Sequence, residues 1–136
     1  PPHNGSMLVK ANTLAEHHRR CEVLFAAVRE AGGGGGEALV ARVNALREAL
    51  LSHFRYEEQH IFPLYEQASG KEGATEWLCA QHDDMRATLW MLNTISPQEA
   101  RQQYLAELVA LQEAFDAHAA DEESRMYPVF EQLLGR

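Results

Sequence analysis

The sequence predicts an all-α protein, an up-down-up-down bundle of four helices. Three observations support this fold class. Apolar residues recur at intervals of three and four, the spacing of one helix face, over four long segments. The connections between these segments are short and contain the Gly, Pro and Ser that interrupt helices. No segment has the strict alternation or the β-branched enrichment that is typical of a strand.

The first helix is expected from Leu8 to Ala31 and ends at a run of glycines, residues 32–36, whose backbone freedom disfavours a helix. Its inward positions are Leu14, His18, Cys21, Phe25 and Val28. The second helix begins at Glu37, and Pro63 is expected to kink or end it, because proline donates no hydrogen bond and clashes with the preceding turn. Its inward stripe is Leu39, Val43, Leu46, Leu50, His53, Glu57 and His60.

The third helix follows a turn at Ser69–Gly70 and is expected from Glu72 to Asn93. Its inward positions are Leu78, His82, Met85, Leu89 and Leu92. Residues 96–99 have the pattern of a capping box, with Ser at the N-cap, Pro at the first helical position and Glu at the third. The fourth helix should then continue to Leu134, with Leu105, Leu108, Leu111, Phe115, His118 and Glu122 inward.

Length and charge indicate one domain and exclude some partners. With 136 residues, the chain can bury a core of its own. Residues 1–6 indicate an expression remnant before Met7, which leaves residues 7–136 as the domain. A net charge of −8 argues against a nucleic-acid surface, and no apolar run is long enough to span a membrane. With no targeting segment either, a cytoplasmic location is expected, in which Cys21 and Cys79 stay reduced.

Two segments 65 residues apart repeat the pattern His-x3-Glu-Glu-x4-Pro, at residues 53–63 and 118–128. Positions i and i+4 share one helix face, so each segment points an imidazole and a carboxylate in one direction. The other two helices each offer one inward histidine, His18 and His82, with apolar residues three and seven positions later. The candidate metal ligands are therefore His18, His53, Glu57, His82, His118 and Glu122.

Such a set fits a pair of cations in a bundle core. Buried carboxylates are costly unless a positive charge compensates them. Imidazole nitrogen together with carboxylate oxygen suits iron, manganese or zinc. Carboxylates from opposite helices can each bridge two metals and leave the histidines as terminal ligands. The coordination positions that remain could take water, oxide, oxygen, peroxide or nitric oxide.

The motifs HFxxEExxxFP from His53, QHDDM around His82 and HxxxEExxxYP from His118 resemble the hemerythrin-like (HHE cation-binding) domains over almost the whole chain. The resemblance implies a non-haem di-iron centre with two iron ions, joined as Fe–O–Fe or by hydroxide. It also implies that Glu57 and Glu122 are bridges and that the four inward histidines are terminal ligands. Zinc or manganese remains an alternative.

The sequence departs from the oxygen-carrying hemerythrins at two points. They have a second histidine four positions from the first on helix three, where this chain has Leu78 and Arg86, and an aspartate in place of Glu122. The expected function is therefore to bind, sense or detoxify oxygen, nitric oxide or peroxide. Catalase-like or nitric oxide reductase activity, iron storage or donation, iron-sulfur repair and a structural zinc bundle remain alternatives.

The sequence leaves alternative assignments for several residues near the predicted ligands. His17 could replace His18, although Arg20 at its third following position makes a solvent-facing position the expectation. His60 could be a fifth histidine near the metals or a polar cap at the end of the bundle. A Cys2His2 zinc site from His18, Cys21, Cys79 and His82 would leave the two glutamates unexplained.

The neighbours of the predicted ligands are assigned supporting places. Glu58 and Glu123 should face solvent or support the ligands, because each is rotated by about 100° from the glutamate before it. Tyr127 is expected to fill core or rim. An apolar sleeve around the metals is predicted from Phe25, Leu78, Leu89 and Phe115.

Overall fold

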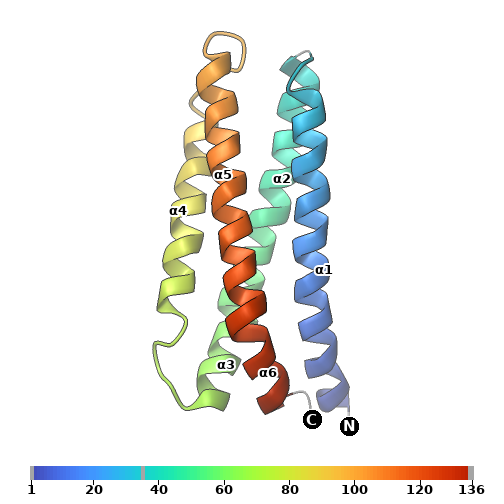
Figure 1. The fold of residues 1–136 in the computed structure, drawn as a ribbon, viewed down its shortest axis with the longest axis vertical. Coiled ribbons are helices and arrows are strands. Elements are labelled where there is room, and N and C mark those ends of the chain that lie inside the picture. Colours follow the sequence, from blue (N-terminus) through green and yellow to red (C-terminus); the bar gives the residue numbers. More distant parts are fainter. Residues whose placement is uncertain (1, 35, 135–136) are drawn as a thin grey trace.

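The structure, a computed structural model, describes residues 2–34 and 36–134, with side chains for 14–34, 36–129 and 131–132. It forms four long helical segments, called rods below, that lie side by side and alternate in direction (Figure 1). The elements are α1 (Pro2–Ala31), α2 (Gly36–Tyr56), the π-helix η1 (Glu57–Ile61), α3 (Phe62–Ser69), α4 (Glu76–Leu92), α5 (Arg101–Asp121), the π-helix η2 (Glu122–Met126) and α6 (Tyr127–Leu134). The first rod is α1, the second is α2, η1 and α3, the third is α4, and the fourth is α5, η2 and α6. The predicted all-α four-helix bundle is confirmed, and the described residues include no strand.

Helices α1 and α4 begin several residues away from the predicted positions. Helix α1 starts at Pro2, so the segment interpreted as an expression remnant continues the helix, and that interpretation stays a prediction. Helix α4 starts at Glu76, because Gly70 and Gly73 adopt left-handed backbone angles, with φ of 70° and 81°, that an α-helix does not contain. The carboxylate of Glu66 then accepts hydrogen bonds from the amide and hydroxyl of Thr75, at 2.9 and 2.6 Å, and holds this connection against α3.

The capping box before the fourth rod is formed in part. The Ser96 hydroxyl accepts a hydrogen bond from the amide of Glu99 at 3.2 Å, as predicted. Ala100, however, has φ −129° and ψ 55°, outside the helical region. The capped turn is therefore separate, and α5 begins only at Arg101.

Buried residues of the bundle form two apolar clusters with a polar layer between them. The larger cluster joins α1, α2, α4 and α5 and contains Phe25, Leu89 and Phe115. The smaller cluster lies nearer α3 and α6 and comprises Leu14, Ile61, Phe62, Leu78, Met126 and Tyr127. The polar layer consists of His18, His53, Glu57, His82, His118 and Glu122, each no more than 2 % exposed. The residues predicted to form a sleeve therefore lie on both sides of this layer.

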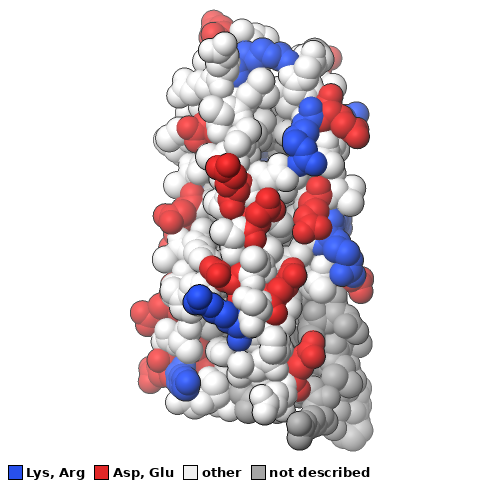
Figure 2. Space-filling model, in the orientation of Figure 1, with Lys and Arg blue, Asp and Glu red and all other residues white. Residues whose placement is uncertain are grey.

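The surface carries more acidic than basic side chains, in agreement with the net charge of −8 (Figure 2). Asp and Glu side chains spread along the face that α5 presents, while Lys and Arg are fewer there and separated (Figure 2). None of the described helices combines the length and apolar character needed to cross a membrane.

Candidate metal centre

Each His-x3-Glu pair ends at a π turn. The amide of Phe62 donates to the carbonyl of Glu57, and the amide of Tyr127 donates to the carbonyl of Glu122, five residues back instead of four. A proline follows in each case, and its ring crowds the carbonyl four residues back, which favours opening of the helix at this point. The interruption predicted at Pro63 is thus a π turn within a continuous rod.

The π turn also changes which side chains point inward. The wider turn places Ile61 and Phe62 in the core after Glu57, and His60 is exposed. The prediction that His60 shares the inward stripe of the second helix is therefore wrong. His60 contacts Tyr56 instead, with ring centroids 5.4 Å apart, and belongs to no cluster of candidate ligands among the described residues.

The six predicted ligands come together as two overlapping groups. One group is His18, His53, Glu57 and Glu122, and the other is His82, His118, Glu57 and Glu122. Within each group the candidate ligand atoms lie within 4.8 Å of one another, and all six residues are buried. The two groups share both carboxylates, so each glutamate faces two possible cation positions.

The contacts inside the polar layer show how the sharing arises. Oε1 of Glu57 lies 3.0 Å from Nε2 of His82 and 3.4 Å from Nε2 of His53. Oε1 of Glu122 lies 3.0 Å from Nε2 of His18 and 3.3 Å from Nε2 of His118. Each carboxylate therefore contacts one histidine from each group, which is the arrangement that two bridging ligands require.

Three buried atoms of this layer have no hydrogen-bond partner: Nε2 of His53, Oε2 of Glu57 and Oε2 of Glu122. A buried polar atom without a partner costs about 1–3 kcal/mol, and more when it is charged. A cation between the imidazoles and carboxylates would satisfy all three atoms at once. The donor set of imidazole nitrogen and carboxylate oxygen also fits iron, manganese or zinc. The residues present therefore fit the metal pair that the sequence predicts.

Comparison with known proteins places the chain in a family. The family model described as the hemerythrin HHE cation-binding domain matches residues 9–130. The chain belongs to this family. No curated protein and no solved structure matches it. Membership of this family indicates cation binding, and the buried polar layer is the part of the described structure that suits it.

The two glutamates of the polar layer have opposite pKa shifts. Burial and the negative charge of Glu122 raise the pKa of Glu57 well above its usual range. Burial also acts to raise the pKa of Glu122, but hydrogen bonds from His118 and His18 outweigh it and hold that pKa well below its usual range. With no cation bound, Glu57 therefore favours its protonated form and Glu122 its ionised form. A cation that binds both must displace the proton.

The four histidines are not electrostatically equivalent. Burial acts to lower the pKa of His18, but hydrogen bonds to Glu122 and Glu123 outweigh it and raise the pKa. Burial and the positive charge of His18 lower the pKa of His53 well below its ordinary value. Burial and the charge of His118 lower the pKa of His82 to about 4. His53 and His82 are thus neutral, the form that binds metal, whereas His18 retains a proton more readily.

A second layer of side chains orients the imidazoles of the hemerythrin domain and repeats between its halves. Nδ1 of His18 lies 2.8 Å from Oε2 of Glu123, and Nδ1 of His82 lies 2.7 Å from Oε2 of Glu58. Each imidazole therefore donates to the residue that follows a candidate bridging glutamate. Such partners fix the tautomer and leave Nε2 free to bind a metal. Both residues therefore support the histidines, and Glu123 also stays exposed to solvent, so both predicted places are observed.

The remaining two histidines are held by the residues that precede His18 and His82. Nδ1 of His53 lies 3.0 Å from Nδ1 of His17, and Nδ1 of His118 lies 2.6 Å from Oε1 of Gln81. His17 is half-buried, so the expectation that it faces solvent is wrong, and it belongs to neither ligand group. No role in the site was predicted for Gln81. Gln81 directly precedes His82 as His17 precedes His18, and this shared position could have indicated its contact with a ligand histidine.

The cysteines do not take part in the polar layer. Cys21 is buried in the larger apolar cluster, and Cys79 packs against the smaller one, on the other side of the layer. Burial raises the pKa of Cys21 to about 12, so it remains a thiol. Neither sulfur joins a group of candidate ligands among the described residues, which disfavours the Cys2His2 zinc alternative.

Proposed function

We propose that this hemerythrin domain is a non-haem di-iron protein that binds, senses or detoxifies oxygen, nitric oxide or peroxide. One observation carries the proposal: two buried histidine pairs share the same two carboxylates. His18 and His53 would hold one iron, His82 and His118 would hold the other, and Glu57 and Glu122 would bridge them. Manganese and zinc fit the donor atoms too, and the family resemblance favours iron.

The residues leave room for an exogenous ligand. Each group offers two imidazoles and two shared carboxylates, fewer donors than an octahedral ion takes. Iron bound there would supply redox chemistry and open coordination positions. The protein would hold the ligands in place through Glu58, Glu123, His17 and Gln81, and the apolar clusters on both sides would restrict water. Small neutral or singly charged molecules suit such a site.

Metal content and the optical spectrum test the proposal. Elemental analysis should return two iron ions per chain after anaerobic iron loading, as the shared carboxylates imply. After exposure to air, the paired ferric ions should absorb in the near ultraviolet, whereas a zinc protein would show no such band. One metal ion or fewer per chain after loading would contradict the proposal.

Reaction of the diferrous protein with oxygen distinguishes a reversible oxygen carrier from a protein that reacts with oxygen irreversibly. Because the fourth rod supplies Glu122 and helix α4 supplies one histidine, the expected site is less rich in histidine than that of the oxygen carriers. The diferrous protein should therefore react with oxygen irreversibly. A stable oxygenated band that bleaches and returns over repeated cycles would instead indicate a carrier. Turnover of peroxide or nitric oxide would indicate an enzyme, and rapid removal of iron by a chelator would indicate storage or donation.

A further inference from the structure

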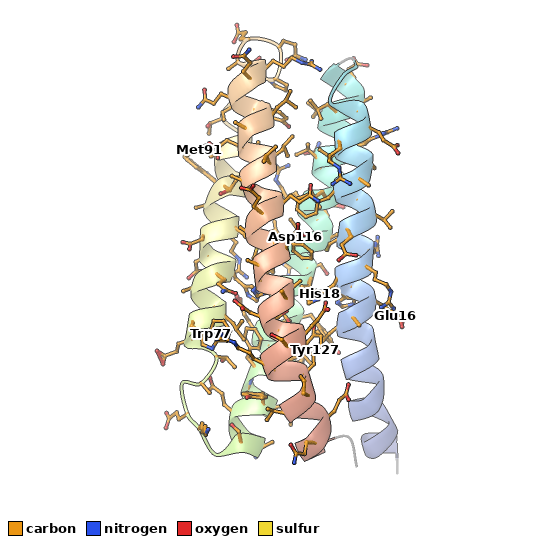
Figure 3. The ribbon with its side chains drawn as sticks, in the orientation of Figure 1. Glu16, His18, Trp77, Met91, Asp116 and Tyr127 are labelled. Carbon is orange, nitrogen blue, oxygen red and sulfur yellow. The ribbon has the colours of Figure 1, made fainter. Side chains whose placement is uncertain are left out.

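Tyr127 is a buried tyrosine whose hydroxyl faces the polar layer. It is the first residue of α6, and 7 % of it is exposed. Its ring stacks on His18, with centroids 5.8 Å apart and planes 21° apart, and its hydroxyl lies 3.4 Å from Nε2 of His18. The two side chains come from different rods and meet between them (Figure 3). No closer partner of the hydroxyl exists among the described residues.

The internal repeat shows that packing does not require this hydroxyl. Phe62 occupies the corresponding place in the other half of the protein, 65 residues earlier. It stacks on His82 in the same way, with centroids 5.5 Å apart and planes 20° apart. A phenyl ring is therefore sufficient to cover the histidine, and the hydroxyl is an addition on the His18 side.

The Tyr127 hydroxyl faces a nitrogen that does not accept its proton. Nδ1 of His18 lies 2.8 Å from Oε2 of Glu123 and Nε2 lies 3.0 Å from Oε1 of Glu122, so both nitrogens donate to carboxylates, and a metal would bind Nε2 in place of its proton. In either state Nε2 has no lone pair for the Tyr127 proton, so this hydroxyl finds no acceptor for its proton among the described residues. A buried hydroxyl without a partner costs about 1–3 kcal/mol. An acceptor supplied by a ligand on the metal would remove that cost.

We propose that Tyr127 donates a hydrogen bond to a small exogenous ligand bound on the His18–His53 side of the centre. The inference rests on the proposed function. The ligand class is a diatomic molecule or small anion with a hydrogen-bond-accepting atom, such as nitric oxide, peroxide or azide. Tyr127 is then a positioning residue that acts on one side of the centre, because Phe62 has no proton to donate on the other.

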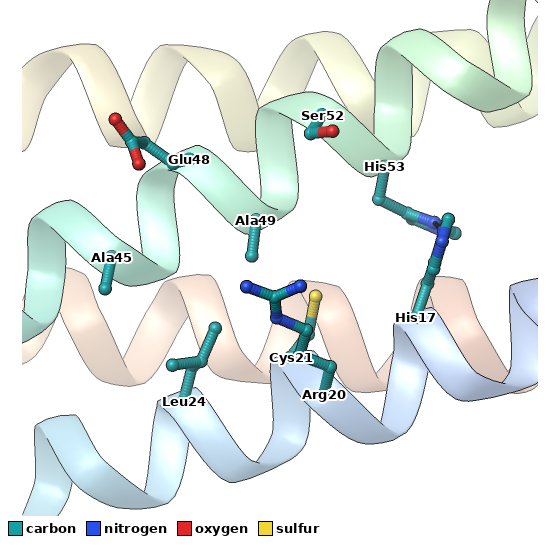
Figure 4. A pocket seen from close by; sticks show the side chains of 9 residues that line it. All are labelled: His17, Arg20, Cys21, Leu24, Ala45, Glu48, Ala49, Ser52 and His53. Carbon is teal, nitrogen blue, oxygen red and sulfur yellow. Dashed lines mark hydrogen bonds between the residues drawn. The ribbon is translucent and has the colours of Figure 1, made fainter.

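A pocket reaches the same side from outside. It has a volume of about 360 Å³, lies between α1 and α2, and is bordered by His17, Cys21 and His53 (Figure 4). The Arg20 guanidinium extends between the two helices at this pocket and makes no ion pair with a described residue. A small anion could therefore approach His53 along a polar route, next to the histidine that Tyr127 covers.

Azide binding to the diferric protein tests the role of Tyr127. The variant Tyr127→Phe should keep two irons, because Phe62 shows that a phenyl ring fits this place, but bind azide about 3- to 10-fold more weakly. The azide vibration in resonance Raman spectra should shift in D2O for the wild type and not for Tyr127→Phe. Tyr104→Phe is the matched control, since Tyr104 is 3 % exposed within the larger apolar cluster, and it should behave as the wild type.

The possible failures are distinguishable. Unchanged azide affinity and an unchanged D2O shift in Tyr127→Phe, with two irons present, would overturn the donor role alone. Loss of one iron, or of a visible ferric-phenolate band that the protein shows without azide, would identify Tyr127 as a metal ligand and also overturn it. Wild-type protein that binds no iron would overturn the proposed function before any azide is added.

Discussion

The two histidine pairs of the polar layer have the same plan but different surroundings. On the α4–α5 side, His82 lies between the rings of Phe54 and Phe62, with centroids 4.3 and 5.5 Å away. Its partner Glu58 is 26 % exposed and accepts two hydrogen bonds of 2.8 Å from Arg86. This side, defined by His82 and His118, is packed by apolar rings and held by a bidentate ion pair.

The α1–α2 side, defined by His18 and His53, is more open. Glu123 is 50 % exposed, and the residue that corresponds to Arg86 is Glu22, which cannot pair with it. The residue that corresponds to Phe54 is Ala119, so among the described residues only the ring of Tyr127 stacks on His18, while Phe115 meets it edge-on. A pocket also borders His53. From this comparison we expect the α4–α5 side to anchor the proposed metal centre and the α1–α2 side to exchange ligands.

Removal of a shared carboxylate should weaken metal binding on both sides alike and cause the largest loss of metal. Glu57→Ala and Glu122→Ala should each lose most of both metals, because each carboxylate contacts one histidine of either side. Added metal should then no longer raise the melting temperature, whereas in the wild type metal at 100 times its Kd adds about 2.7 kcal/mol of stability. Metal content and thermal unfolding are the measurements.

Glu113→Ala is the control for these variants, because Glu113 is exposed on α5. It should retain two metals. If Glu57→Ala or Glu122→Ala instead loses a single metal and keeps the other, the carboxylate is not shared.

The two sides should lose their metals at different pH values. The pKa of His18 is raised, so its proton competes with the metal already near neutral pH, and binding on the α1–α2 side weakens as the pH falls. The pKa of His82 is lowered to about 4, so it stays neutral and able to bind metal down to that pH. Glu57, whose pKa is raised, contacts histidines of both sides, so its protonation should weaken both metals alike. Metal content measured from about pH 8 to about pH 4 should therefore still fall in two steps, the α1–α2 side first, because His18 and His82 differ.

The variant Glu123→Gln tests whether His18 sets the pH of the first step of metal loss. It removes a carboxylate that raises the pKa of His18, so the first step should move to lower pH while the second stays in place. Simultaneous loss of both metals in a single step would show that the two sides do not differ in this way.

The smallest of these effects should come from the residues that orient His53 and His118. His17→Ala should weaken the metal on the α1–α2 side, and Gln81→Ala the metal on the α4–α5 side, each by about 10-fold, because metal affinity depends on such partners. Metal titration with a competing chelator measures both changes. His60→Ala should have no effect, since His60 is exposed. If His17→Ala removes the metal and His18→Ala does not, His17 is the ligand on α1.

Local chemistry explains why much of the site is readable in the sequence. The i, i+4 spacing of His53 and Glu57, and of His118 and Glu122, places each pair on one helix face whatever the rest of the chain does. The apolar residues three and seven positions after His18 and His82 identify an inward face in the same way. These patterns recur every three or four residues, so they do not depend on distant contacts.

Other features depend on contacts that no local pattern contains. The π turn η1 displaces His60 from the inward face, and the place at which a helix widens before a proline depends on how the neighbouring helices hold it. The start of α4 depends on Glu66 and Thr75, which meet across a connection with two left-handed glycines. The role of His17 depends on how α1 packs against α2, since its partner His53 lies 36 positions away.

The sequence by itself determined the four helices, the family and the six candidate ligands, because helix periodicity and the repeated His-x3-Glu pattern are properties of short segments. Only the tertiary structure decided that each carboxylate contacts a histidine from either side and that Tyr127, unlike Phe62, directs a hydroxyl at the layer. It also decided that Arg86 braces one side alone. These relations follow from the relative rotation and axial position of four packed helices, which depend on side-chain packing along their whole length.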